Sequence, residues 1–296
     1  MRAITTAAQT AYTGAAWRAL ARRVALFGLF LGCSLLVFVF GVDYHTRFWT
    51  NSSGAFKVGV SALFLFAMLI LRRSARGRVY WPIAFSFLAA SLANVTTWYL
   101  AAPLQRWVLG LVGAVQGTPQ GQMWGKGVDV VLKLAPIFVL LWLAHERLDS
   151  VYIQRGRLGW SLTVGFLALV NFTATAIAVV ASKGGDLAAV FASLPWWFAF
   201  SLINAFMEEI WFRGLFLRRL EPAIGAAGAL WLTTLAFATS HLFTTYIDVW
   251  GTFTFGIITC TLAIAWGLLM QKTNTLWGSV VFHTAGDVYG AVAVGF

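Results

Sequence analysis

Long apolar segments separated by short polar ones run along the whole chain. Most of them approach the roughly 20 residues that a helix needs to cross the hydrocarbon core of a bilayer. The pattern predicts an all-α, polytopic integral membrane protein with about eight or nine transmembrane helices, the ninth being the short last segment. The expected spans are residues 24–42, 57–71, 79–101, 128–145, 158–181, 192–217, 227–243, 250–270 and 276–295.

Two of the segments outside these spans are long. Residues 1–23 are rich in alanine and carry three arginines near their end, a composition typical of a helix that lies at the membrane interface. Residues 102–127 are rich in Gly, Gln and Pro and are predicted to form a loop, in which RWVLGLVGAV forms a further interfacial helix. The chain divides into residues 1–190, which carry no recognisable motif, and residues 191–296, where the polar chemistry concentrates.

The charged residues support the same map. Only 10 % of the 296 residues are charged, against about 25 % in a soluble domain. If the predicted spans alternate across the membrane from an inner N-terminus, 14 of the 21 Lys and Arg residues fall in inner segments and five in outer ones. Cytoplasmic loops carry such an excess, so the N-terminus is predicted to be cytoplasmic, in a bacterial inner membrane. The net charge of +11 then reflects topology, and without a nucleic-acid motif no nucleic acid partner is expected.

The stretch AFMEEIWFRG, at residues 205–214, places three charges inside an apolar span. Ionisable groups at bilayer depth are costly and indicate a functional site by default. Residues four apart share a helix face, so Arg213 is predicted to pair with Glu209, whereas Glu208 lies on the face of Asn204. An unpaired, partly desolvated carboxylate suits a general base. The structural alternative is that both glutamates serve one ion pair with Arg213.

Three more polar residues lie in later spans. His241 occurs in FATSHLF, and His283 and Asp287 are four residues apart in FHTAGD. As structural residues, His241 would be a hydrogen-bonded core histidine and His283 with Asp287 a local pair. At 1.5 Å per residue these three and Glu208 lie about 12–22 Å from the inner ends of their spans, near the middle of a core about 30 Å thick. They are therefore expected to meet.

A glutamate, two histidines and an aspartate around one buried cavity suggest the activation of water, by either of two routes. A divalent metal such as zinc, held by Glu208, His241 and His283, would lower the pKa of its bound water to about 7. Alternatively, Glu208 and His241 deprotonate water directly, while His283 and Asp287 polarise the substrate or stabilise the oxyanion. The zinc motif H-E-x-x-H is absent, and the cofactor stays undecided between a metal and none.

The order of EEIWFRG, FATSH and FHTAGD resembles the CPBP intramembrane proteases, which include CAAX-processing endopeptidases and bacteriocin-processing or Abi proteins. The resemblance covers about residues 192–296 and rests on three motifs. These are Glu208-Glu209-x-x-x-Arg213, Phe237-x-x-x-His241 and His283-x-x-x-Asp287.

The resemblance implies an all-helical membrane protease whose site faces a water-filled cavity. Glu208 would activate water beside His241, and Glu209 with Arg213 would form a supporting ion pair. His283 and the residue four later would form the oxyanion site. In the prenyl-protein endopeptidases that last residue is usually Asn. Here it is Asp287, which cannot donate to an oxyanion unless it is protonated and whose alternative role is to orient His283.

The predicted function is an intramembrane endopeptidase that hydrolyses a peptide bond in a membrane-associated protein or peptide, with the lipid bilayer as its surroundings. The alternative from another class is a non-proteolytic membrane scaffold or regulator, acting in immunity or signalling, on the same fold. A third reading is a proton-coupled transporter with Glu208 as the proton carrier. Paired repeats and broken helices would favour a transporter, and the sequence shows no repeat.

Overall fold

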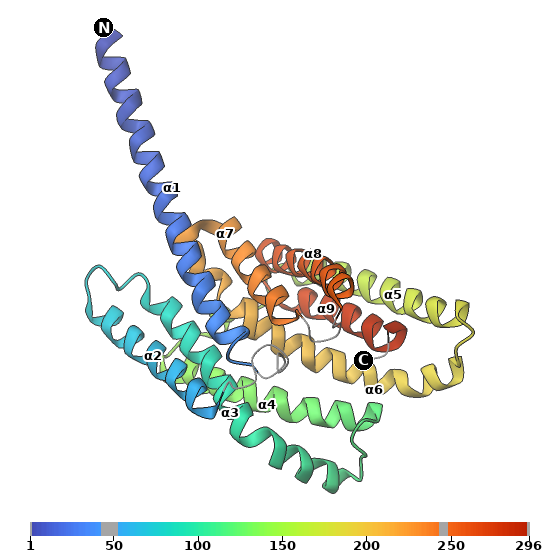
Figure 1. The fold of residues 1–296 in the computed structure, drawn as a ribbon. Helices are drawn as coiled ribbons and strands as arrows, with labels where there is room; N and C mark the ends of the chain where they lie inside the picture. The colour runs from blue at the N-terminus through green and yellow to red at the C-terminus, as the bar shows by residue number, and fades with distance from the viewer. Residues whose placement is uncertain (1, 43–52, 243–247, 295–296) are drawn as a thin grey trace.

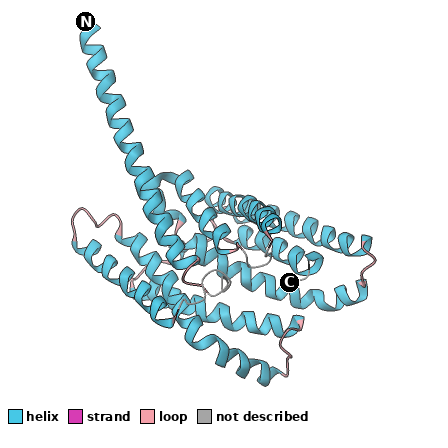
Figure 2. Ribbon diagram, in the orientation of Figure 1, coloured by secondary structure: helices cyan, strands magenta, loops and turns pink. Residues whose placement is uncertain are grey.

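The computed structural model describes residues 2–42, 53–242 and 248–294, and these form helices joined by loops and turns, without a strand (Figures 1 and 2). Nine α-helices occur in these ranges. They are α1 (Arg2–Phe38), α2 (Gly54–Arg73), α3 (Trp81–Val112), α4 (Pro119–Leu143), α5 (Leu158–Ser182), α6 (Leu187–Glu208), α7 (Leu217–Ser240), α8 (Val249–Thr273) and α9 (Trp277–Tyr289). A 3₁₀ helix, η1 (Leu148–Val151), and two π-helices, η2 (Glu209–Gly214) and η3 (Gly290–Val294), complete the elements.

Seven of the described helices are long and apolar enough to cross a membrane. The candidate spans are Ala16–Phe38, Gly54–Arg73, Trp81–Val112, Leu158–Ser182, Leu187–Gly214, Leu217–Ser240 and Val249–Thr273. The chain is therefore an all-α, polytopic integral membrane protein, as the sequence predicts. The two other helices are α4, which carries Lys126, Asp129 and Lys133, and α9, which at 13 residues is too short to cross alone.

The helices run back and forth between two ends of the bundle (Figure 1). One end gathers loop 74–80, segment 144–157, junction 215–216 and turn 274–276, and we call it the arginine end. Hydrogen bonds tie these segments together. Arg218 donates to the carbonyl of Asp149 and to the side chain of Asn274, and the Ser86 hydroxyl, near the start of α3, donates to the Leu215 carbonyl at 2.7 Å.

The opposite end, which we call the far end, carries loops 113–118 and 183–186 (Figure 1). The predicted loop at 102–127 is wrong, because α3 continues to Val112 and α4 already begins at Pro119. The Gly and Pro residues of this stretch fit helix ends. Gly113 caps α3 with φ 64°, and Pro119 occupies the first turn of α4 after Thr118, whose hydroxyl accepts from the Gly121 amide at 3.1 Å.

One other expected element also differs from the structure. Residues 2–38 form one continuous helix, so the first 23 residues are not a separate interfacial helix. The span expected at 192–217 corresponds to the candidate span Leu187–Gly214, in which α6 continues into the π-helix η2. Within the next candidate span, α7, Gly225 has a non-helical φ of 80°, and the helix after this kink ends at Ser240.

Close packing of α5 against α9 positions the helix that carries His283 and Asp287. The two helices lie side by side (Figure 1). Small residues let their backbones approach, since a Cβ added at Gly165 would sit 2.7 Å from the Gly278 carbonyl oxygen. The amide of Gly278 donates to the Ser161 hydroxyl at 3.0 Å. This contact therefore leaves no room for even a methyl group.

We expect Gly165→Ala to destabilise the protein, because the added methyl would meet backbone atoms of α9. Overpacking of this kind costs about 1–3 kcal/mol of unfolding free energy. The matched control is Gly159→Ala in the same helix, where nothing lies within 4 Å of the added Cβ. Thermal unfolding in detergent should give a lower Tm for Gly165→Ala alone. Equal Tm values for the two variants would show that α5 and α9 are not tightly packed.

Candidate functional site

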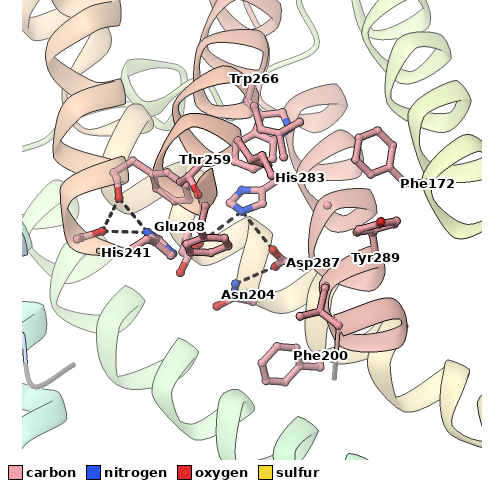
Figure 3. A pocket seen from close by; sticks show the side chains of 18 of the residues that line it. Phe172, Phe200, Asn204, Glu208, His241, Thr259, Trp266, His283, Asp287 and Tyr289 are labelled. Carbon is pink, nitrogen blue, oxygen red and sulfur yellow. Dashed lines mark hydrogen bonds and ion pairs between the residues drawn. The ribbon is translucent and has the colours of Figure 1, made fainter. Parts of the chain in front are cut away.

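A cavity of about 390 Å³ lies inside the bundle, among α4, α5, α6, α7, α8 and α9 (Figure 3). Its lining includes all four residues predicted to meet, namely Glu208 from the end of α6, His241 from the end of α7, and His283 and Asp287 from α9. Aromatic side chains supply much of the remaining wall. Helix α7 ends at the cavity, because Ser240, its last residue, and His241, which follows it, both line the cavity.

A chain of three buried charged or polar groups underlies the cavity. The Arg213 Nη1 lies 2.6 Å from Glu209 Oε1, and both side chains are fully buried. The same carboxylate oxygen lies 2.8 Å from His283 Nδ1. A carboxylate oxygen that binds Arg213 is an acceptor, so Nδ1 of His283 donates and carries a proton. Glu209 therefore links α9 to α6, which its spacing from Arg213 alone did not predict.

The other ring nitrogen of His283 faces the two remaining carboxylates (Figure 3). Its Nε2 lies 3.5 Å from Glu208 Oε2 and 3.5 Å from Asp287 Oδ1. The Trp266 ring stacks on the imidazole, with centroids 3.7 Å apart and planes at 14°. Hydrogen bonding on one edge and stacking on one face fix the ring, so that Nε2 is held toward Glu208 and Asp287.

His241 is held by the last turn of α7. Its Nδ1 lies 2.8 Å from the Phe237 carbonyl oxygen and 3.1 Å from the Ser240 hydroxyl. A carbonyl can only accept, so Nδ1 is the donor, and in the neutral ring Nε2 is then the acceptor. The Glu208 side chain, 12 % exposed, lines the same cavity. A carboxylate and a neutral imidazole with an acceptor nitrogen can both take a proton from water.

Sequence reasoning gave no role to Asn204, which the structure places in the cavity wall. Its Nδ2 donates to Asp287 Oδ2 at 2.9 Å (Figure 3). The signal was present, since Asn204 is one helical turn before Glu208 and shares its face. Its partner on α9 could not be read from that spacing.

Lys126 is the second residue that sequence reasoning missed, because it was expected in an outer loop. It lies in α4 and lines the cavity, with its ammonium 5.1 Å from the centroid of the Phe200 ring. The N-terminal half of the chain, which carries no motif, thus supplies a cation to the site.

The metal candidates Glu208, His241 and His283 line the cavity, but they are not arranged as a ligand set. Among the described residues, no group of three or more His, Cys, Asp or Glu side chains is placed to hold a metal ion. The geometry therefore offers no ligand set from which a metal-dependent step can be derived.

Residues 190–289 match the family model of the type II CAAX prenyl endopeptidase, Rce1-like. The match covers about a third of the chain, from α6 to the end of α9, and includes all the residues named above except Lys126. It is consistent with a CPBP family intramembrane protease. A search of curated proteins and of solved structures finds no match to this chain.

We expect Arg213→Met to destabilise the protein strongly, because it leaves Glu209 buried without its counter-ion. Breaking a buried ion pair from one side costs about 3–5 kcal/mol, whereas replacing both partners is often close to neutral. The double variant Glu209→Gln/Arg213→Met should therefore unfold at a higher temperature in detergent than Arg213→Met. If the double variant is as unstable as the single one, the interaction of Arg213 with Glu209 is not what stabilises this region.

Proposed function

Because residues 190–289 carry an Rce1-like, type II CAAX prenyl endopeptidase domain, we propose that this integral membrane protein is an intramembrane endopeptidase. It hydrolyses a peptide bond in a membrane-associated protein or peptide. The observation that supports this most is the placement of Glu208, His241, His283 and Asp287 around one cavity. The two that are furthest apart in the sequence, Glu208 and Asp287, are separated by 79 positions. Each of the four groups can accept or donate a proton.

In this proposal Glu208 is the general base. Arg213 is engaged by Glu209 at 2.6 Å, so the Glu208 carboxylate is left to the cavity. A water molecule beside it gives a proton to Glu208 as its oxygen attacks the carbonyl carbon of the scissile bond. His241, through its acceptor Nε2, orients this water. Glu208 then returns the proton to the leaving amine as the peptide bond breaks, which closes the proton balance.

His283 is proposed to stabilise the oxyanion that forms on the carbonyl oxygen. With Nδ1 donating to Glu209, the doubly protonated ring has a second N–H, on Nε2, to donate. Preorganised donors of this kind are worth most in a site that excludes bulk water. The Arg213–Glu209–His283 chain supplies the fixed orientation.

Asp287 is proposed to orient His283, because an ionised carboxylate has no proton to donate. One of its oxygens accepts from Asn204 and the other lies 3.5 Å from His283 Nε2. The prenyl-protein endopeptidases of this family usually carry an asparagine at the position of Asp287. In this chain the side-chain amide at this place in the site belongs to Asn204, which lies in α6. Residues 191–296 would act as the catalytic unit, with residues 1–190 completing its walls.

The rival proposal is a non-proteolytic scaffold or regulator on the same fold. A scaffold does not need carboxylates at bilayer depth, which are costly to bury. A scaffold would also tolerate the loss of the Glu208 charge, so one substitution separates the two.

Glu208→Gln should abolish proteolysis, because an amide cannot take the proton from water. We expect a loss of at least about 10²–10⁴-fold, the usual contribution of general base catalysis. The measurement compares the termini of membrane proteins in cells that carry the wild type or Glu208→Gln at matched expression. New termini should occur only with the wild type.

The matched control is Glu221→Gln, which changes a glutamate of α7 that accepts from Gln271 at 3.1 Å and does not line the cavity. The termini of membrane proteins in cells that carry Glu221→Gln should equal those in cells that carry the wild type. Identical termini with wild type and Glu208→Gln would refute the peptidase and favour the scaffold.

Asp287→Asn should retain more activity than Asp287→Ala. The asparagine can still bond Asn204 and provides an amide beside His283, whereas alanine removes both contacts. Without Asp287 the ring of His283 is less well oriented toward the oxyanion. Losing an oxyanion-site contact typically costs about 10²–10³-fold, so we expect a loss of up to this size for alanine. The loss is measured as the rate at which the Glu208-dependent termini appear, meaning the protein termini found with the wild type and not with Glu208→Gln. Equal rates for the two variants would mean that the negative charge of Asp287 is what the reaction needs.

A further inference from the structure

We propose that the cavity opens on the extracytoplasmic side of the membrane, so that the substrate is a polypeptide segment exposed on the outer face. The orientation rests on the cavity and on the distribution of charge, whereas the identification of the occupant as a substrate rests on the proposed peptidase function.

The cavity is closed toward the arginine end. Glu209 and Arg213 lie on that side of His283, and both have no exposed surface. Large apolar side chains fill the rest of this floor. They include Phe212, Trp266, Met270 and Val280, each at most 3 % exposed. A substrate cannot reach Glu208 from the arginine end without displacing them.

The cavity reaches the protein surface on the opposite side. Two of its lining residues are exposed, Ile258 at 51 % on α8 and Val294 at 48 % in η3. Val294 follows α9, which starts at the arginine end, and therefore lies toward the far end. Lys126, in the second turn of α4, also lines the cavity from the far end.

The cations divide unequally between the two ends. Thirteen described residues lie at or next to the arginine end: Arg18, Arg22, Arg23, Arg72, Arg73, Arg76, Arg78, Arg147, Arg155, Arg157, Arg218, Arg219 and Lys272. Four lie toward the far end: Lys57, Arg106, Lys126 and Lys183. Short cytoplasmic loops carry the excess of Lys and Arg. The arginine end is therefore cytoplasmic, and the cavity, closed on that side, faces outward.

A cavity that opens outward limits the substrates to polypeptides that can reach it from the outer face of the membrane. Glu208 is reached by the outer segments of membrane-anchored proteins and by exported polypeptides held at the membrane. Cytoplasmic chains are excluded unless they first cross the bilayer. The exposed Ile258 on α8 further allows an apolar part of the substrate to lie against the lipid-facing side of the same cavity.

Cysteine labelling in spheroplasts of a bacterial host tests the orientation. The two cysteines, Cys33 and Cys260, are first changed to serine, and single cysteines are introduced into the full chain as Val294→Cys at the cavity, Lys183→Cys in the far-end loop and Arg155→Cys at the arginine end. A membrane-impermeant maleimide is added before or after permeabilisation. We expect Val294→Cys and Lys183→Cys to react in intact spheroplasts and Arg155→Cys to react only after permeabilisation.

The reverse pattern would overturn the inference. Lys183→Cys also decides the orientation if Val294→Cys proves unreactive, because its side chain lies in an exposed loop. A thermal unfolding temperature in detergent equal to that of the cysteine-free parent shows that each variant folds.

The positions of the Glu208-dependent termini test the substrate class. We expect them in outward-facing segments of membrane proteins or in exported proteins, and termini in cytoplasmic segments would overturn the assignment. If no Glu208-dependent terminus exists, the peptidase function fails, whereas the labelling result still stands for the orientation of the cavity.

Discussion

The carboxylate of Glu209 is the group on which the rest of the site depends. One of its oxygens accepts from both Arg213 and His283, so a single buried group joins Arg213 in η2 to α9. In a low-dielectric interior neither the arginine nor the glutamate could be buried alone, because an unpaired buried charge costs several kcal/mol. The buried ion pair and the contact of Glu209 with His283 therefore require that η2 and α9 keep their positions relative to each other. This requirement also fixes which nitrogen of His283 faces Glu208.

The packing of α5 on α9 meets the same requirement from the other side. Gly165, Gly278 and Ser161 let the two backbones touch, and α9 is too short to be held by the bilayer itself. Apolar burial cannot drive helix association in lipid as it does in water, so close backbone approach and hydrogen bonds hold α9 in place. Helix α9 is thus placed by the polar contact of His283 with Glu209 and by the close approach of its backbone to α5.

Much of this could be predicted from the sequence. Apolar length gave the helical membrane fold, and helical spacing placed Glu209 beside Arg213 and apart from Glu208. Spacing could not reveal the contact between Glu209 and His283, which are 74 positions apart, nor the one between Asn204 and Asp287. The helix ends at Val112 and Pro119 were missed because Gly and Pro were taken as loop residues when they cap helices. Placing Lys126 in a loop then hid its place in the cavity.

The outward-opening cavity that we propose would have an electrical consequence. A cavity that brings water from the far end down to Glu208 shortens the insulating layer to the buried floor beneath it. The membrane potential, worth about 2.3 kcal/mol per elementary charge per 100 mV, then falls mainly across that floor. Arg213 and Glu209 lie within it, and their opposite charges 2.6 Å apart form a compact dipole with no net charge. The field therefore exerts almost no net force on the pair, and the geometry of the site is insulated from changes in the energisation of the membrane.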